Sequence, residues 1–210
     1  YEDSLRILGE TCGVSERAKT VTEFINSVIA DLRARTENIP DDDKPSILAA
    51  AATFKGSHGI EGVYSNYAVF DVISVNDVTR AMMDSELPKG VLVDKEQILA
   101  WDPDMIFLDY SGLELVRKDM AANPDFYAPL SAFNSGNVYQ CPNSTWHWSN
   151  VDIPLVSAYY MGSLLYPEAF ADVDFEAKAA EIFEFFLGKP DYLNTLAEAG
   201  AGYMKLDLEG

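Results

Sequence analysis

The order of apolar and polar positions predicts a long helix near the start of the chain. Four apolar residues follow one another at intervals of four, three and four positions: Val21, Ile25, Val28 and Leu32. This spacing gives a helix over residues 15–35 one apolar face. A shorter helix is expected over 4–11, ended by Gly13. Pro40 and the three aspartates after it (41–43) predict an exposed break between this helical arm and the rest of the chain.

Short runs of apolar residues predict strands that are buried on both faces. Three such runs lie at 46–54, 105–108 and 138–141, and a short extended segment is expected at 91–93. Helical patterns lie at 76–83, 95–101, 113–122, 153–166, 175–187 and 192–199. Strands that alternate with helices predict an α/β fold. We expect a three-layer lobe with a mainly parallel sheet flanked by helices, preceded by a long connector helix.

The composition fits a folded chain with a large core and excludes some partners. Of the 210 residues, 48% are hydrophobic, which is enough for a sizeable core. No apolar run approaches the ~20 residues of a membrane-spanning helix, so we expect no transmembrane segment in this chain. The net charge is −19, from 34 acidic and 15 basic residues. Such an acidic surface repels phosphate backbones and anionic lipids, and no nucleic-acid partner is expected.

Residue types that carry catalysis or hold metals are scarce. Cys12 and Cys141 are the only cysteines, and His58 and His147 are the only histidines. Because they show no CxxC spacing and no cluster, a structural zinc site is not expected. Both cysteines are interpreted as small buried residues. The sequence shows no Ser/His/Asp constellation and no paired carboxylates, so we expect no catalytic residue, no metal site and no cofactor.

Candidate ligand-binding residues lie in three loops. In an open parallel sheet, ligands bind outside the carboxyl ends of the strands. The loops that follow the three predicted strands span 55–67, 109–111 and 143–150. Their candidate ligand-binding residues are Ser57, His58, Tyr64, Tyr67, Tyr110, Trp146, His147, Trp148 and Asn150. Lys55 is the only lysine or arginine in these loops, so either the ligand is neutral or another part of the protein supplies cations.

Several loop residues have two interpretations. The indoles of Trp146 and Trp148 either stack on a planar or catecholate ligand or form the local core of a loop folded back onto its own lobe. His147 is interpreted as a hydrogen-bonded histidine. Residues 55–59 lack the ending of a phosphate loop, and their glycines either turn the chain or let a ligand approach the backbone. The aspartates beside the second strand are expected to be solvated or to cap helices: Asp102, Asp104 and Asp109.

Three segments carry a resemblance to a known family. They are KEQILAWDPDMI at 95–106, LSAFNSGNVY at 130–139 and LYPEAF at 165–170. In this order and spacing they resemble the periplasmic binding proteins that serve iron-siderophore, haem and cobalamin ABC importers. The segments GSHGI at 56–60 and AYYMG at 158–162 are similar to those of archaeal and anaerobic-bacterial iron-complex receptors.

The resemblance implies a domain organisation. In this family two α/β lobes are joined by a long, rigid helix, and the ligand lies between the lobes. Residues 1–40 then correspond to the helical arm and connector helix, and 41–210 to the C-terminal lobe. The N-terminal lobe is expected to be absent from this sequence.

The resemblance also implies a function and partners. The expected ligand is a ferric siderophore, haem or a corrinoid, and the expected protein partner is an ABC transporter permease. Glu168 is either the acidic residue that docks on permease arginines or an ordinary surface glutamate at a helix end. The expected location is extracytoplasmic, either periplasmic or lipoprotein-anchored, and no enzymatic activity is expected. The alternative is a metal- or tetrapyrrole-handling enzyme with a chelatase- or nitrogenase-like fold.

Overall fold

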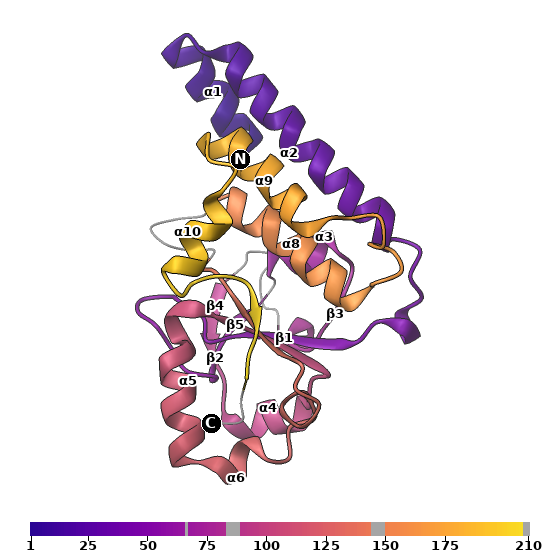
Figure 1. Ribbon diagram of the computed structural model, residues 1–210, viewed down its shortest axis with the longest axis vertical. Helices are drawn as coiled ribbons and strands as arrows, with labels where there is room; N and C mark the ends of the chain where they lie inside the picture. The colour runs from indigo at the N-terminus through magenta and orange to yellow at the C-terminus, as the bar shows by residue number, and fades with distance from the viewer. Residues whose placement is uncertain (66, 83–88, 144–149, 208–210) are drawn as a thin grey trace.

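Three parallel strands form the centre of the structure. The computed structural model describes all residues except 66, 83–88, 144–149 and 208–210 (Figure 1). Strand β5 (Met105–Asp109) lies between β1 (Ser46–Ala50) and β6 (Val138–Cys141) and pairs in parallel with both. The predicted α/β fold with a mainly parallel central sheet is therefore confirmed, and its strands end at a common edge.

The central strands are buried on both faces because their side chains alternate between two apolar cores. One core receives these residues from the strands: Ile47, Ala49, Met105, Phe107, Tyr139 and Cys141. The other receives Leu48, Ala50, Ile106, Leu108 and Val138. Because side chains alternate along a strand, unbroken apolar runs are what a sheet covered on both faces requires.

Helices cover both faces of the sheet. On one face lie α4 (Lys95–Trp101), α5 (Tyr110–Ala122), α6 (Pro124–Tyr127) and α7 (Ser131–Asn134). On the other lie α2 (Ser15–Thr36), α3 (Ala68–Val72), α8 (Asp152–Leu165), α9 (Phe175–Leu187) and α10 (Tyr192–Glu198). Figure 1 shows α4, α5 and α6 below the sheet and α2, α3, α8 and α9 above it. The helices predicted at 95–101, 113–122, 153–166, 175–187 and 192–199 are all present.

Four short strands complete the sheet in the part of the chain that the structure describes. The strand order is β4-β2-β1-β5-β6-β7, and β3 pairs in parallel with the start of β1. Antiparallel pairing adds β2 (Gly62–Ser65) to β1, β4 (Lys89–Leu92) to β2, and β7 (Met204–Lys205) to β6, whereas β3 spans Asn76–Asp77. Strand β4 roughly matches the extended segment expected at 91–93. The sequence patterns predicted none of the other three.

Two predicted elements differ in the structure. The apolar run at 46–54 leaves the sheet after Ala50, because Ala51 adopts φ 56°, in the left-handed region. A helix was predicted over 76–83, but the described part of this segment, 76–82, forms β3 and a short 3₁₀ turn (η2, Arg80–Met82). The Asp77 carboxylate accepts hydrogen bonds from the backbone and side chain of Thr79 at 2.9 and 2.8 Å. Such local bonding competes with a helix.

Helices α1 (Glu2–Cys12) and α2 form a hairpin at the start of the chain. Gly13 closes α1 with φ 71°, as expected. Gly9 lets the two helices approach, since a Cβ there would lie 2.6 Å from the Ala18 Cβ. Cys12 is exposed on α1 whereas Cys141 is buried, so the prediction of burial is wrong for the first cysteine and confirmed for the second.

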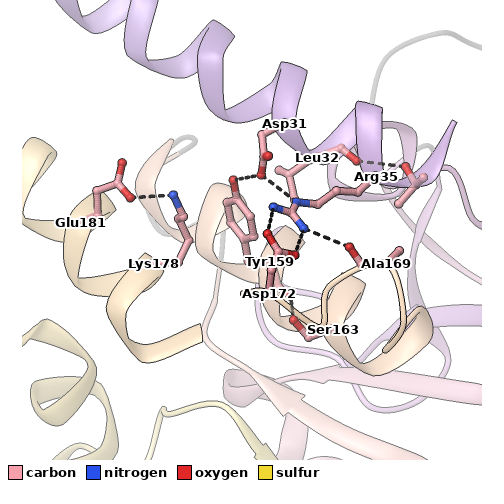
Figure 2. A network of polar contacts seen from close by, with 10 residues as sticks. Asp31, Leu32, Arg35, Tyr159, Ser163, Ala169, Asp172, Lys178 and Glu181 are labelled. Atoms are coloured by element: carbon pink, nitrogen blue, oxygen red, sulfur yellow. Dashed lines mark hydrogen bonds and ion pairs between the residues drawn. The ribbon is translucent and has the colours of Figure 1, made fainter. Parts of the chain in front are cut away.

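Helix α2 is fastened to the lobe by apolar and polar contacts. Val28 and Leu32 belong to the core that it shares with α8 and α9. Figure 2 shows Arg35 at the centre of a polar network that joins α2 to α8 and to the turn after α8. Its guanidinium donates to Asp31 at 3.0 Å, to Asp172 at 2.6 and 3.0 Å, and to the Ala169 carbonyl at 3.0 Å.

Tyr159 on α8 completes this network. Its hydroxyl donates a hydrogen bond to the Asp31 carboxylate at 2.7 Å. Asp31 therefore joins the arginine of its own helix to a neighbouring helix. The domain boundary at residue 40 stays a prediction, and α2 packs against the lobe beyond that boundary.

Replacing Arg35 with Met is expected to lower the free energy of unfolding by about 2 kcal/mol, because charge-assisted hydrogen bonds to three residues are lost. Only 18% of the Arg35 side chain is exposed. Arg33→Met on the same helix is the matched control, because Arg33 is exposed, and it should change stability by less than about 0.5 kcal/mol. Urea denaturation measures both. Equal losses would contradict the assigned role of Arg35.

Candidate ligand-binding site

Side chains from three elements meet at the carboxyl edge of the sheet. Asp109 ends β5, Tyr64 lies on β2, and Thr53 follows β1. The Tyr64 hydroxyl donates to the Asp109 carboxylate at 2.6 Å and accepts from the Thr53 backbone N–H at 3.1 Å. One phenol thus links three segments that are distant in the sequence.

Asn143 extends this network to the end of β6. Its side-chain oxygen accepts from the Ser111 backbone N–H at 3.0 Å, and its amide nitrogen donates to the Thr53 hydroxyl at 3.3 Å. The same nitrogen also contacts the Ser111 hydroxyl. The segments that follow β1, β5 and β6 are therefore joined to one another, as the parallel sheet predicted.

A glycine allows the start of α5 to approach the loop after β1. A Cβ on Gly112 would lie 2.2 Å from the His58 carbonyl oxygen and 2.5 Å from the Ala51 carbonyl oxygen. Real Cβ atoms do not approach backbone this closely, so only glycine fits without moving one of the two segments. Gly112 therefore lets the start of α5 pack directly against the segment that follows β1.

Asp109 is the buried charged group of this site. The residue is 5% exposed, which contradicts the expectation of a solvated carboxylate. It does occupy the N-cap position of α5, although its side chain makes no capping hydrogen bond there. Burial raises the pKa of its carboxyl to about 7, against the lowering effect of the hydrogen bond from Tyr64. Asp102 and Asp104 are exposed as expected, and each accepts hydrogen bonds from a serine, Ser131 and Ser46 respectively.

Other buried titratable groups lie close by. Cys141 is the β6 partner of Asp109 in the sheet register. Burial, and secondly the charge of Asp109, raise the pKa of the Cys141 thiol well above its ordinary value. Burial also raises the pKa of the Asp152 carboxyl in the first turn of α8, where backbone N–H groups partly offset the effect. Burial thus disfavours the charged form of each of these groups.

Two predicted tyrosines form a stacked pair at the edge. The rings of Tyr64 and Tyr67 lie 5.1 Å apart at an angle of 15°. Tyr67 also meets Phe70 edge to face at 5.1 Å. Both tyrosines are more than nine-tenths buried, so they form an aromatic wall within the lobe. The structure therefore brings Tyr64, Tyr67 and Asp109 together.

The predicted residues of the glycine-containing loop lie beside this wall. Ser57 is exposed and makes an isolated backbone bridge with Thr53. The His58 ring stacks on Phe54 at 4.1 Å, and its Nε2 lies 2.8 Å from the Phe54 carbonyl oxygen. These contacts favour the interpretation of residues 55–59 as a structural turn.

The other predicted site residues are more exposed or lie outside the described residues. Tyr110 is 40% exposed, and its hydroxyl donates to the Ala199 carbonyl at 3.0 Å. Asn150 is exposed. Trp146, His147 and Trp148 fall within 144–149, outside the described residues, so both interpretations of the indoles stay open.

The sequence prediction left four residues of the network out of the site: Thr53, Asp109, Ser111 and Asn143. Asp109, Ser111 and Asn143 follow predicted strands, and that position was the available signal, whereas Thr53 lies within the strand predicted at 46–54. Among the residues that the structure describes, no group of three His, Cys, Asp or Glu side chains could hold a metal ion. Within the same residues, no helix is long and apolar enough to cross a membrane.

The turn after α8 contains Glu168, the predicted docking residue. Its neighbours Tyr166 and Phe170 are buried, and the Tyr166 hydroxyl donates to the Ser74 carbonyl at 3.0 Å. A Cβ at Gly162 would lie 2.3 Å from the Phe170 ring, so this glycine makes room for it. Glu168 itself is exposed. The LYPEAF segment therefore anchors the turn with two aromatic residues and leaves the glutamate at the surface.

A family profile decides the affiliation of the chain. The profile described as "Periplasmic binding protein" matches residues 1–145. The chain belongs to this family. The matched segment includes α1, α2, the central strands and most of the carboxyl-edge network. No curated protein sequence matches the chain.

Solved structures of periplasmic binding proteins share the fold at low sequence identity. An ABC transporter solute-binding protein from Sulfurospirillum deleyianum is 20% identical, with a TM-score of 0.68, over 90% of this chain and 57% of that one. The molybdate-bound binding protein MolA from Haemophilus influenzae is 16% identical, with a TM-score of 0.67, over 88% and 55%.

A third similar structure comes from an Fe³⁺-hydroxamate transport system. The protein from Saccharomonospora viridis is 13% identical, with a TM-score of 0.53, over 79% of this chain and 54% of that one. At such identities the likeness shows the fold alone. This 210-residue chain spans just over half the length of the solved structures that it matches.

Asp109 should make stability depend on pH. Its carboxyl has an ordinary pKa of 3.8 and a folded pKa of about 7, so the folded state holds this proton more tightly than the unfolded state. The resulting stabilisation is lost as pH rises towards 7 and is absent above it. From pH 5 to pH 8, the wild type should lose roughly 3 kcal/mol more unfolding free energy than Asp109→Asn.

The control for this experiment is Asp125→Asn, which changes an exposed aspartate in the first turn of α6. Its pH dependence should match that of the wild type. Urea denaturation at the two pH values measures all three proteins. Parallel pH profiles for the wild type and Asp109→Asn would show that the buried carboxyl does not titrate in this range.

Proposed function

We propose that this chain provides the C-terminal lobe and connector helix of a solute-binding component of an ABC importer. In this proposal it captures an iron complex, a ferric siderophore or related metal chelate, outside the cytoplasm and delivers it to the permease. The observation that carries the proposal is the carboxyl-edge network, in which Tyr64, Asp109 and Asn143 join three loops. Ligands of open α/β sheets bind at such an edge.

The charge of the edge bears on the ligand. Lys55 is the only lysine or arginine in the loops at 55–67, 109–111 and 143–150, and it is exposed. An anionic ligand would need cations, and these three loops supply a single lysine. We therefore propose a neutral ferric hydroxamate as the preferred ligand. Anionic ferric catecholates, haem and corrinoids are the other outcomes of the test.

The proposal includes a second lobe and a docking residue. Helix α1 exposes Ile7 and Leu8, at 53% and 59%, and Val14 follows it at 52%. Neighbouring exposed apolar residues favour a partner surface, and we propose that the second lobe of the receptor covers them. The exposed Glu168 would meet permease arginines, since a carboxylate pairs with guanidinium through two hydrogen bonds.

The members of this family with similar structures are solute-binding proteins, and the proposed role involves no catalysis. The alternative of a metal- or tetrapyrrole-handling enzyme requires a convergent cluster of His, Cys and acidic side chains. The described residues supply no observation that favours it. A receptor should bind its chelate saturably and release it chemically unchanged.

A tryptophan-fluorescence titration of the full-length protein tests the proposal. The panel contains a neutral ferric trihydroxamate, an anionic ferric tris-catecholate, haem and cobinamide. We expect the hydroxamate to quench the fluorescence with a Kd of about 1 μM or below. Trp148→Phe should reduce the quenching. Trp101→Phe is the matched control, because Trp101 lies on α4 across the sheet, and its quenching should persist.

Each outcome of the titration bears on a different part of the proposal. Saturable binding of another panel member would keep the receptor role and replace the ligand. No response to any member, together with no heat of binding by calorimetry, would contradict the proposed function.

A further inference from the structure

One arginine on α2 fastens the turn that carries Glu168. The turn spans residues 166–174, between α8 and α9. The Arg35 guanidinium binds the Ala169 carbonyl and both carboxylate oxygens of Asp172. It also lies over the Phe170 ring, 5.4 Å from the centroid. Arg35 thus contacts the turn at three residues within four positions of Glu168.

Asp31 and Tyr159 fix the position of the Arg35 side chain on the side away from the turn. Its Nε donates to Asp31 one helical turn earlier, and Asp31 accepts a second hydrogen bond from the Tyr159 hydroxyl. Figure 2 shows the guanidinium between Asp31 on one side and Asp172 and Ala169 on the other. A planar guanidinium held in this way makes directed, two-point contacts that an ammonium group cannot make.

The turn has few other polar attachments to the lobe. Within it, backbone hydrogen bonds join Phe170 to Tyr166, Ala171 to Glu168 and Val173 to Phe170. The Tyr166 hydroxyl binds the Ser74 carbonyl before the start of β3. Past Phe170, the polar contacts between the turn and α2 in the part of the chain that the structure describes all run through Arg35. The orientation of the turn relative to α2 therefore depends on this side chain.

A surface that must dock in one orientation gains affinity when it is held rigid beforehand. We infer that Arg35 is a positioning residue for docking on the permease. It ties the turn that carries Glu168 to α2, the helix that would lead to the second lobe. This inference rests on the proposed function. It adds a requirement that neither the exposed glutamate nor the family membership implies, namely that docking depends on a residue of the connector helix.

The test compares ligand affinity with permease affinity in the full-length receptor. The variants are Arg35→Met, Arg35→Lys, Arg33→Met and Glu168→Gln. Fluorescence titration with the neutral ferric trihydroxamate gives ligand affinity, and binding to the importer reconstituted in nanodiscs gives permease affinity. Arg35→Met should keep ligand affinity within about twofold and weaken docking about tenfold, the loss expected for a charge-assisted hydrogen bond.

The other variants separate this inference from the proposed function. Arg35→Lys, which keeps the charge and is the variant least disturbing to folding, should weaken docking by an intermediate factor. Arg33→Met should dock as the wild type does. Normal docking of folded Arg35→Met and Arg35→Lys, with weakened docking of Glu168→Gln, would overturn the inference alone. Normal docking of Glu168→Gln would overturn the proposed docking residue, on which the inference depends.

Discussion

The parallel pairing of β1, β5 and β6 determines where the loops and helices of this lobe can lie. Their in-register pairing ends all three strands at one edge, and the segments that follow them must meet there. The strands can lie side by side only if both sheet faces are covered, which explains the two apolar cores and the helices on each side. The Tyr64–Asp109 bond and the contacts of Asn143 follow from this arrangement.

The two proposed functional surfaces lie at opposite ends of these strands. The ligand loops follow the carboxyl ends, whereas the turn with Glu168 is anchored through Tyr166 to Ser74, next to the strand that pairs with the start of β1. Helix α2 reaches this second surface through Arg35 and shares its apolar face with α8 and α9. In the proposed function, the ligand and the permease would therefore bind at two separate surfaces of this lobe, both connected to the sheet.

The sequence predicted the elements that repeat a strong pattern and missed those set by tertiary contacts. The strand around Ile106 and the helix at 95–101 follow directly from apolar periodicity. Strand β2 was not predicted because its four residues lie in a glycine-containing segment without a clear apolar pattern. It forms through tertiary pairing with β1 and β4. Burial of Asp109 was missed because an aspartate after a strand usually faces solvent. Hydrogen bonds from the Tyr64 hydroxyl, brought in by β2, and from the Thr53 backbone accommodate this buried carboxyl.

Hydrogen–deuterium exchange of the full-length protein, with and without the ferric trihydroxamate, tests whether the carboxyl edge of this lobe binds the ligand. If it does, exchange should slow on binding in residues 51–67, 109–112 and 142–151 and should not change in α4 and α6 on the far side of the lobe. Saturable binding that leaves those three segments unprotected would place the ligand elsewhere and contradict the proposed binding site.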